Sequence, residues 1–102
     1  MALEKHYSGD DAWKRFFQYA INNPLSGEVF NQDAFPNYEN LSPAALAILQ
    51  TAVAYYGVDR TKKWLEVSLP ALEGKAPKDC LFASDDSSLQ NRIREYLMRL
   101  QA

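Results

Sequence analysis

The sequence has 102 residues, of which 47% are hydrophobic and 24% are charged. This length allows one small domain, and the composition is typical of a globular protein rather than a disordered one. The 11 basic and 13 acidic residues give a net charge of −2, so the basic excess of proteins that grip nucleic-acid phosphates is missing. We expect a cytoplasmic protein without membrane association, because no apolar run approaches a membrane span and the first residues lack a signal-peptide pattern.

Helical spacing of apolar residues runs through most of the chain, and no stretch alternates as a half-buried strand would. The sequence therefore predicts an all-α fold, a single-domain helical bundle of four to six helices over residues 1–102. The first helix should begin within residues 8–11, where side-chain oxygens can cap free amides, and end before Pro24. Its apolar stripe comprises Trp13, Phe16, Phe17, Ala20 and Ile21.

Residues 25–41 complete the N-terminal part of the chain. Four large apolar residues make a wholly irregular loop of this length improbable, so we expect a helical turn around residues 27–32 and an aromatic-anchored extended stretch after it. A stronger helix start follows at Ser42 and Pro43, a capping hydroxyl and a proline at the first helical position. The run over residues 44–56 is apolar on most sides, which predicts a central helix.

Residues 57–101 continue the helical pattern. Gly57 is expected to end the central helix in a left-handed conformation, and a short helix over residues 60–67 should turn Trp64 and Leu65 inward. The dozen residues after it are interpreted as loop and turn, punctuated by Pro70, Gly74 and Pro77. The last helix should begin near residues 85–88, helped by a capping box of Ser87 and Gln90. Its predicted inner stripe is Leu89, Ile93, Tyr96, Leu97 and Leu100, with Arg92, Arg94, Glu95 and Arg99 outside it.

Catalytic chemistry is difficult to assemble from these residues. The single histidine, His6, lies in a terminus that is expected to fray, so it is a poor base for a nucleophile and leaves few ways to build a metal site. Cys80 has apolar neighbours and is expected to be a small core residue. The acidic pairs at residues 10–11 and 85–86 stand at helix starts, where carboxylates stabilise the helix dipole. We therefore predict no enzyme activity, no metal and no cofactor.

A motif in residues 51–81 carries more information. It contains a Tyr-Gly turn after an aliphatic helix, a Trp-Leu pair that ends the next helix, and a loop punctuated by proline and glycine. The residues are Gly57, Trp64, Leu65, Pro70, Leu72, Gly74, Pro77, Asp79 and Leu81. This pattern resembles the C-terminal toxin-binding domain of the Xre/MbcA/ParS antitoxin family, and the resemblance extends from about residue 45 to residue 102. Leu69 stands where the family has Asn, and residues 1–50 lack the pattern of the helix-turn-helix that many members carry.

The resemblance implies a bacterial antitoxin-like protein, with residues 42–102 as its toxin-binding region. Its partner would be a RES-domain, NAD-consuming toxin, whose active site the loop and the final helix would occlude. We expect most of the motif residues to have a structural role, because large apolar residues and prolines hold a loop against the core. We hypothesise that the partner-binding residues are Lys75, Lys78, Arg92, Arg94, Tyr96 and Arg99, with Met98 as a further apolar contact.

Two other function classes stay open. A DNA-binding transcriptional regulator is disfavoured, because residues 1–41 hold three basic and six acidic residues and residues 42–102 hold eight and seven. An adaptor or immunity-like protein, of phage or secretion-system origin, would bind a partner unrelated to RES-domain toxins. The aromatic face of the first helix is more often core than interface, although it is also a candidate surface for a homodimer.

Overall fold

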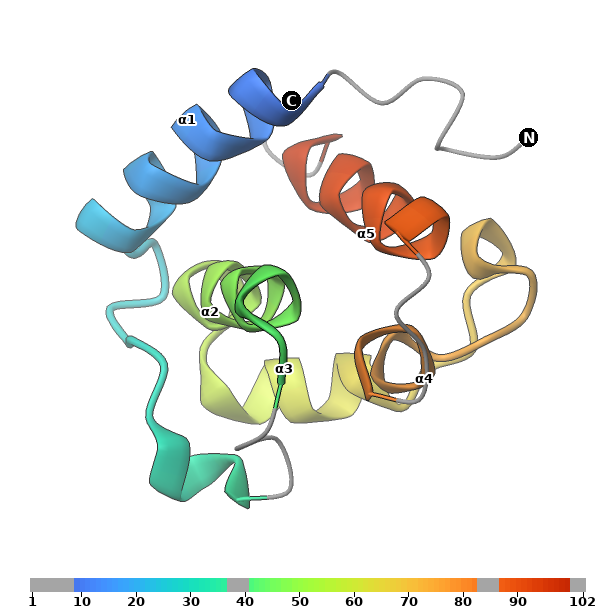
Figure 1. The fold of residues 1–102 in the computed structure, drawn as a ribbon. Coiled ribbons are helices and arrows are strands. Elements are labelled where there is room, and N and C mark those ends of the chain that lie inside the picture. The colour runs from blue at the N-terminus through green and yellow to red at the C-terminus, as the bar shows by residue number, and fades with distance from the viewer. Residues whose placement is uncertain (1–8, 37–40, 83–86, 100–102) are drawn as a thin grey trace.

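The computed structural model of this chain describes residues 9–36, 41–82 and 87–99. Over these ranges it contains five α-helices, two short 3-10 turns and no strand, which confirms the predicted all-α fold (Figure 1). The elements are α1 (Asp10–Asn22), η2 (Gln32–Ala34), α2 (Pro43–Tyr56), α3 (Val58–Leu65), η4 (Pro70–Leu72), α4 (Pro77–Phe82) and α5 (Ser87–Arg99). None of the described helices is both long enough and apolar enough to cross a membrane.

Helix α2 lies at the centre of the bundle, in contact with α1, α3 and α5. Its position follows from its composition, because alanine and aliphatic residues cover most of its surface and are buried along most of its length. The predicted cap is present: the Ser42 hydroxyl oxygen accepts a hydrogen bond from the Ala45 N–H at 3.2 Å, and Pro43 occupies the first turn. The predicted central helix is therefore confirmed.

Helix α1 buries its aromatic stripe against this centre. Trp13, Phe16 and Ala20 are buried, whereas Phe17 and Ile21 are half-buried. The Phe16 ring stacks on Tyr55 of α2, with ring centroids 5.2 Å apart. The helix begins at Asp10 after Gly9, which supplies no side-chain cap, so the expected oxygen cap is absent at that position; Ser8 lies outside the described residues. The predicted end before Pro24 is confirmed.

The segment that follows α1 differs from its prediction. The helical turn, η2, begins only at Gln32, the last residue of the expected range 27–32, and Leu25 and Val29 are 69% and 60% exposed. Phe35 is buried and stacks on Phe30 at 5.6 Å, so the aromatic anchor is real. The start of the segment is held by polar contacts instead, since Ser26 donates hydrogen bonds to the Val53 and Ala54 carbonyls at the end of α2.

Two further boundaries differ from expectation. Helix α3 begins at Val58 rather than residue 60, directly after Gly57, whose φ of 84° is positive as predicted but whose ψ of 170° is extended rather than left-handed helical. Residues 77–82 form the short helix α4 where a loop was predicted. The reason is Pro77 itself, because a proline with no N–H to satisfy suits the first position of a helix as well as a loop.

Helix α5 confirms most of its predicted inner stripe, because Leu89, Ile93 and Leu97 are buried. Glu95 was predicted to lie outside that stripe, and this was wrong: the residue is only 4% exposed. Its burial is compensated, since the Arg99 Nε–H donates to the Glu95 carboxylate at 3.0 Å. Leu100, Asp85, Asp86 and the Ser87 side chain of the proposed capping box lie outside the described residues.

Candidate binding surface

The motif residues gather where α3, η4, α4 and α5 meet. Trp64, Leu65, Leu72, Pro77 and Leu81 are all buried there. They hold the intervening loop on the core, which is the structural role that their chemistry suggested. Three motif residues are different: Pro70, Gly74 and Asp79 are exposed.

The loop of residues 66–75, called here the η4 loop, is closed by its own backbone. The Leu69 N–H donates to the Lys75 carbonyl at 3.1 Å, and the Gly74 N–H returns to the Leu69 carbonyl at 3.0 Å. Gly74 has a φ of 82°, and Glu73 before it has a φ of 60°, a left-handed conformation that few non-glycine residues adopt. The loop lies at the edge of the molecule beside α5 and is exposed over most of its length (Figure 1).

Three predicted contact residues lie in this loop or beside it. Lys78 of α4 forms an ion pair with Glu66 at 3.1 Å, and Arg92 of α5 forms one with Glu73 at 3.3 Å. The Arg92 side chain is only 12% exposed, so it ties the loop to α5 more than it faces solvent. Lys75 is exposed, and no described carboxylate lies within ion-pair distance of it.

The remaining predicted contact residues do not join these three in one basic face. Arg94 points to the other side of α5, where its guanidinium lies over the Trp13 ring at 5.9 Å and donates to the Asn91 side chain. Arg99 is engaged with Glu95. Met98 is partly buried against the core. Arg94 therefore lies on the α1 side of the final helix, apart from Lys75, Lys78 and Arg92 at the η4 loop.

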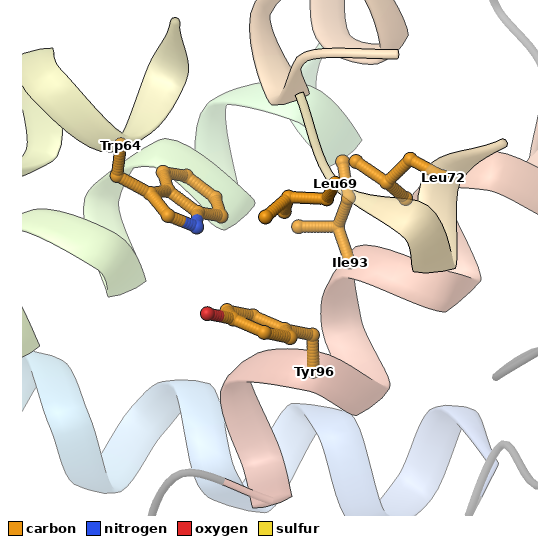
Figure 2. Close-up of a pocket in the computed structure, with 5 residues that line it drawn as sticks. All are labelled: Trp64, Leu69, Leu72, Ile93 and Tyr96. Carbon is orange, nitrogen blue, oxygen red and sulfur yellow. The ribbon is translucent and has the colours of Figure 1, made fainter. Parts of the chain in front are cut away.

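Sequence reasoning missed an open hollow next to the η4 loop. It has a volume of about 270 Å³ and is lined by Tyr56, Arg60, Trp64, Val67, Leu69 and Tyr96. A crevice with no room for a water molecule adjoins this hollow (Figure 2). Its walls are formed by Trp64, Leu69, Leu72, Ile93 and Tyr96. One sequence signal could have indicated this hollow. The spacing of four residues between Tyr56, Arg60 and Trp64 places them on the same side of two consecutive helices, although Gly57 separates those helices.

The polar side chains that line this hollow differ in the partners that they have. Burial raises the pKa of the Tyr56 hydroxyl, and the neighbouring Tyr96 raises it further, so Tyr56 stays a neutral phenol. The Arg60 guanidinium lies over the Tyr56 ring at 5.5 Å and has no ion pair among the described residues. The Trp64 Nε1–H is buried and has no acceptor among the residues that the structure describes.

Candidate catalytic and metal-binding residues occupy other places. Cys80 is fully buried in the apolar core, as predicted. No group of three or more histidine, cysteine or acidic residues that could hold a metal ion occurs in residues 9–36, 41–82 and 87–99. His6 lies outside these ranges.

Comparison with known proteins gives no match: no family model, no curated protein and no solved structure matches this chain. A functional assignment therefore rests on the residues and geometry of the chain itself. The strongest geometric features are the self-closed η4 loop and the hollow beside it.

Proposed function

We propose that this protein is an antitoxin-like inhibitor that binds a cognate toxin enzyme and occludes its active site. The resemblance of residues 51–81 suggests a RES-domain, NAD-consuming toxin as the partner and the bacterial cytoplasm as the setting. In this proposal the chain is not itself an enzyme; it acts by protein contact alone.

The observation that carries the proposal is the construction of the η4 loop. An inhibitor that enters an active site binds more tightly when its inserting segment is already ordered, because less conformational entropy is lost on association. The η4 loop fits this requirement through its internal hydrogen bonds and through the two ion pairs that tie Glu66 and Glu73 to neighbouring helices.

Lys75 is the best candidate for the charged contact within this loop. It is exposed at the point where the loop closes, and its charge is not matched by an ion pair among the described residues. Lys78 and Arg92 already have acidic neighbours, so their charges are partly neutralised before any partner arrives. We therefore place Lys75 ahead of the other predicted cations as a direct contact.

The test is an NAD-consumption assay of the cognate RES-domain enzyme, titrated with the full chain. We expect stoichiometric inhibition by the unaltered protein and at least a tenfold weaker inhibition by Lys75→Glu, because a contact charge is reversed. Lys14→Glu makes the same charge change on the exposed face of α1 and is expected to inhibit like the unaltered protein. Absence of inhibition by the folded chain would contradict the proposed function, and equal weakening by both variants would contradict the role of Lys75.

A further inference from the structure

The hollow beside the η4 loop combines apolar walls with two hydrogen-bond donor side chains. Among the described residues, one of them has no acceptor and the other has no acidic partner. Val67 and Leu69 supply aliphatic surface, and Tyr56, Trp64 and Tyr96 supply rings. Trp64 is only 8% exposed, and its indole N–H is buried without an acceptor among the described residues. Figure 2 shows the indole nitrogen facing the space between this ring and Tyr96.

A buried donor without an acceptor is unusual in a folded protein and destabilises it, because the donor has lost its hydrogen bond to water. Arg60 adds a second unmatched donor at the rim, and its positive charge has no acidic partner in the described part of the chain. The Trp64 N–H requires an acceptor oxygen, and the Arg60 guanidinium favours an oxygen that carries negative charge. The walls call for an apolar group beside that oxygen.

The size of the hollow limits what can enter. Its volume of about 270 Å³ lies below the range of roughly 300–1,000 Å³ that is typical of sites for drug-sized molecules. One bulky side chain with its neighbouring backbone is a better match. Val67 and Leu69 belong both to the hollow and to the η4 loop. A partner chain that contacts these two residues of the loop therefore also contacts the hollow.

We infer that this hollow binds a peptide segment of a partner protein in which an apolar side chain stands next to a carboxylate. The apolar side chain contacts Val67, Leu69 and the rings, and the carboxylate pairs with Arg60. The Trp64 N–H donates to an oxygen of the same segment. The segment is internal to the partner chain, so the carboxylate belongs to an acidic side chain next to the apolar one.

Binding requires a small movement of one ring. The Trp64 and Tyr96 rings lie nearly parallel, with centroids 6.4 Å apart and planes 18° apart, and the indole nitrogen has no contact with solvent. An oxygen reaches the Trp64 N–H only when Tyr96 swings away from it. Tyr96 is half-buried, whereas Ile93 and Leu97 of the same helix are buried, so Tyr96 is the residue of this face with the most room to move.

The test is a nuclear magnetic resonance titration of the full chain that follows the indole N–H signals. A Trp13→Phe variant identifies the Trp64 signal, since the chain has two tryptophans. Three probes are compared: acetyl-Ala-Ala-Leu with a free carboxylate, acetyl-Ala-Leu-Glu-Ala-amide, and the uncharged acetyl-Ala-Ala-Leu-amide. We expect a saturable downfield shift of the Trp64 signal with acetyl-Ala-Leu-Glu-Ala-amide. A shift with acetyl-Ala-Ala-Leu alone would show that the hollow binds a chain terminus and would overturn the assignment to an acidic side chain.

Variants locate the site. Arg60→Gln is expected to weaken binding of the charged probe at least fivefold, whereas Arg15→Gln, the same change on the exposed face of α1, leaves it unchanged. Trp64→Phe keeps the apolar wall but removes the donor, so it is expected to weaken binding as read from the Val67 and Leu69 amide signals. An unmoved Trp64 signal with both charged probes, or equal binding of the uncharged probe, would overturn the inference. This result is independent of the toxin assay, which uses the enzyme and not these peptides.

Discussion

At the scale of single residues, Gly57 shows how backbone geometry selects an amino acid. Its φ of 84° with a ψ of 170° joins α2 directly to α3, and this combination is essentially restricted to glycine. A Cβ at this position would also lie 2.5 Å from Glu28 Oε1, although that carboxylate is the end of a flexible side chain and can move. The conformation, more than the contact, therefore fixes glycine here.

We predict that Gly57→Ala lowers the free energy of unfolding by about 1–3 kcal/mol. Asparagine tolerates the left-handed helical region but not this extended one, so Gly57→Asn should be equally destabilising. Chemical denaturation of both variants measures the effect. A clear rescue by asparagine would show that residue 57 adopts a left-handed helical conformation instead.

The paired tyrosines of the hollow predict a dependence of stability on alkaline pH. The folded-state pKa of Tyr56 is raised above its ordinary value of 10.0, chiefly by burial. Above that pH the unfolded chain releases this proton while the folded chain retains it, so the free energy of unfolding falls as the pH rises. Denaturation at pH values above 10 should show a smaller fall in Tyr56→Phe. Tyr55, whose pKa burial also raises, keeps part of the effect in that variant.

At the scale of elements, the central helix depends on its first turn. We predict that Ser42→Ala lowers the free energy of unfolding by about 1 kcal/mol, because the Ala45 N–H loses its acceptor. Ser68→Ala, an exposed serine between α3 and η4, serves as the control and is expected to change stability little. Equal stability of the two variants in thermal unfolding would show that the cap does not contribute.

The η4 loop behaves as a separate element whose order depends on few contacts. Glu73→Gln removes the ion pair with Arg92, and Glu73 is 63% exposed, so the loss in global stability should stay below about 1 kcal/mol. We predict faster hydrogen exchange at the Leu69 and Gly74 amides, which close the loop. The control variant is Asp33→Asn, which removes the same charge from η2, away from the loop. Unchanged exchange in Glu73→Gln would mean that the backbone bonds alone order this loop.

Sequence reasoning predicted elements better than it predicted surfaces. The central helix and the inward Trp64 could be read from local signals, a cap and an apolar period, and both were confirmed. Glu95 could not, because its burial depends on Arg99 and on packing that one helix does not reveal. The hollow was missed for a similar reason, since Arg60 and Tyr96 meet only when α3 and α5 pack together.

At the scale of the whole molecule, the predicted contact cations of the described residues do not gather on one face. Arg92 and Lys78 pair with acidic residues of the η4 loop, and Arg94 lies over Trp13 on the other side of α5. With a net charge of −2, we predict no salt-dependent affinity for duplex DNA. Fluorescence anisotropy with a labelled duplex at low and physiological salt checks this. Tight binding that weakens steeply with salt would favour the regulator alternative.

The aromatic face of α1 bears on the homodimer alternative. Trp13 and Phe16 are buried within one chain, so this face already has a covering inside the bundle. Among the described residues, the large apolar side chains that are exposed are Tyr19, Leu25, Val29 and Val67. A homodimer, if it forms, is therefore expected to use these residues, and light scattering of the purified chain measures its mass.

The central claim is that this chain inhibits an enzyme by binding it, and affinity capture tests it most directly. The tagged full chain is purified from its native host at physiological salt, and the proteins that remain bound in stoichiometric amount are identified by mass spectrometry. The account predicts a RES-domain enzyme whose NAD consumption is restored when the complex is dissociated. A stoichiometric partner without that domain, or duplex DNA in place of any protein, would contradict it.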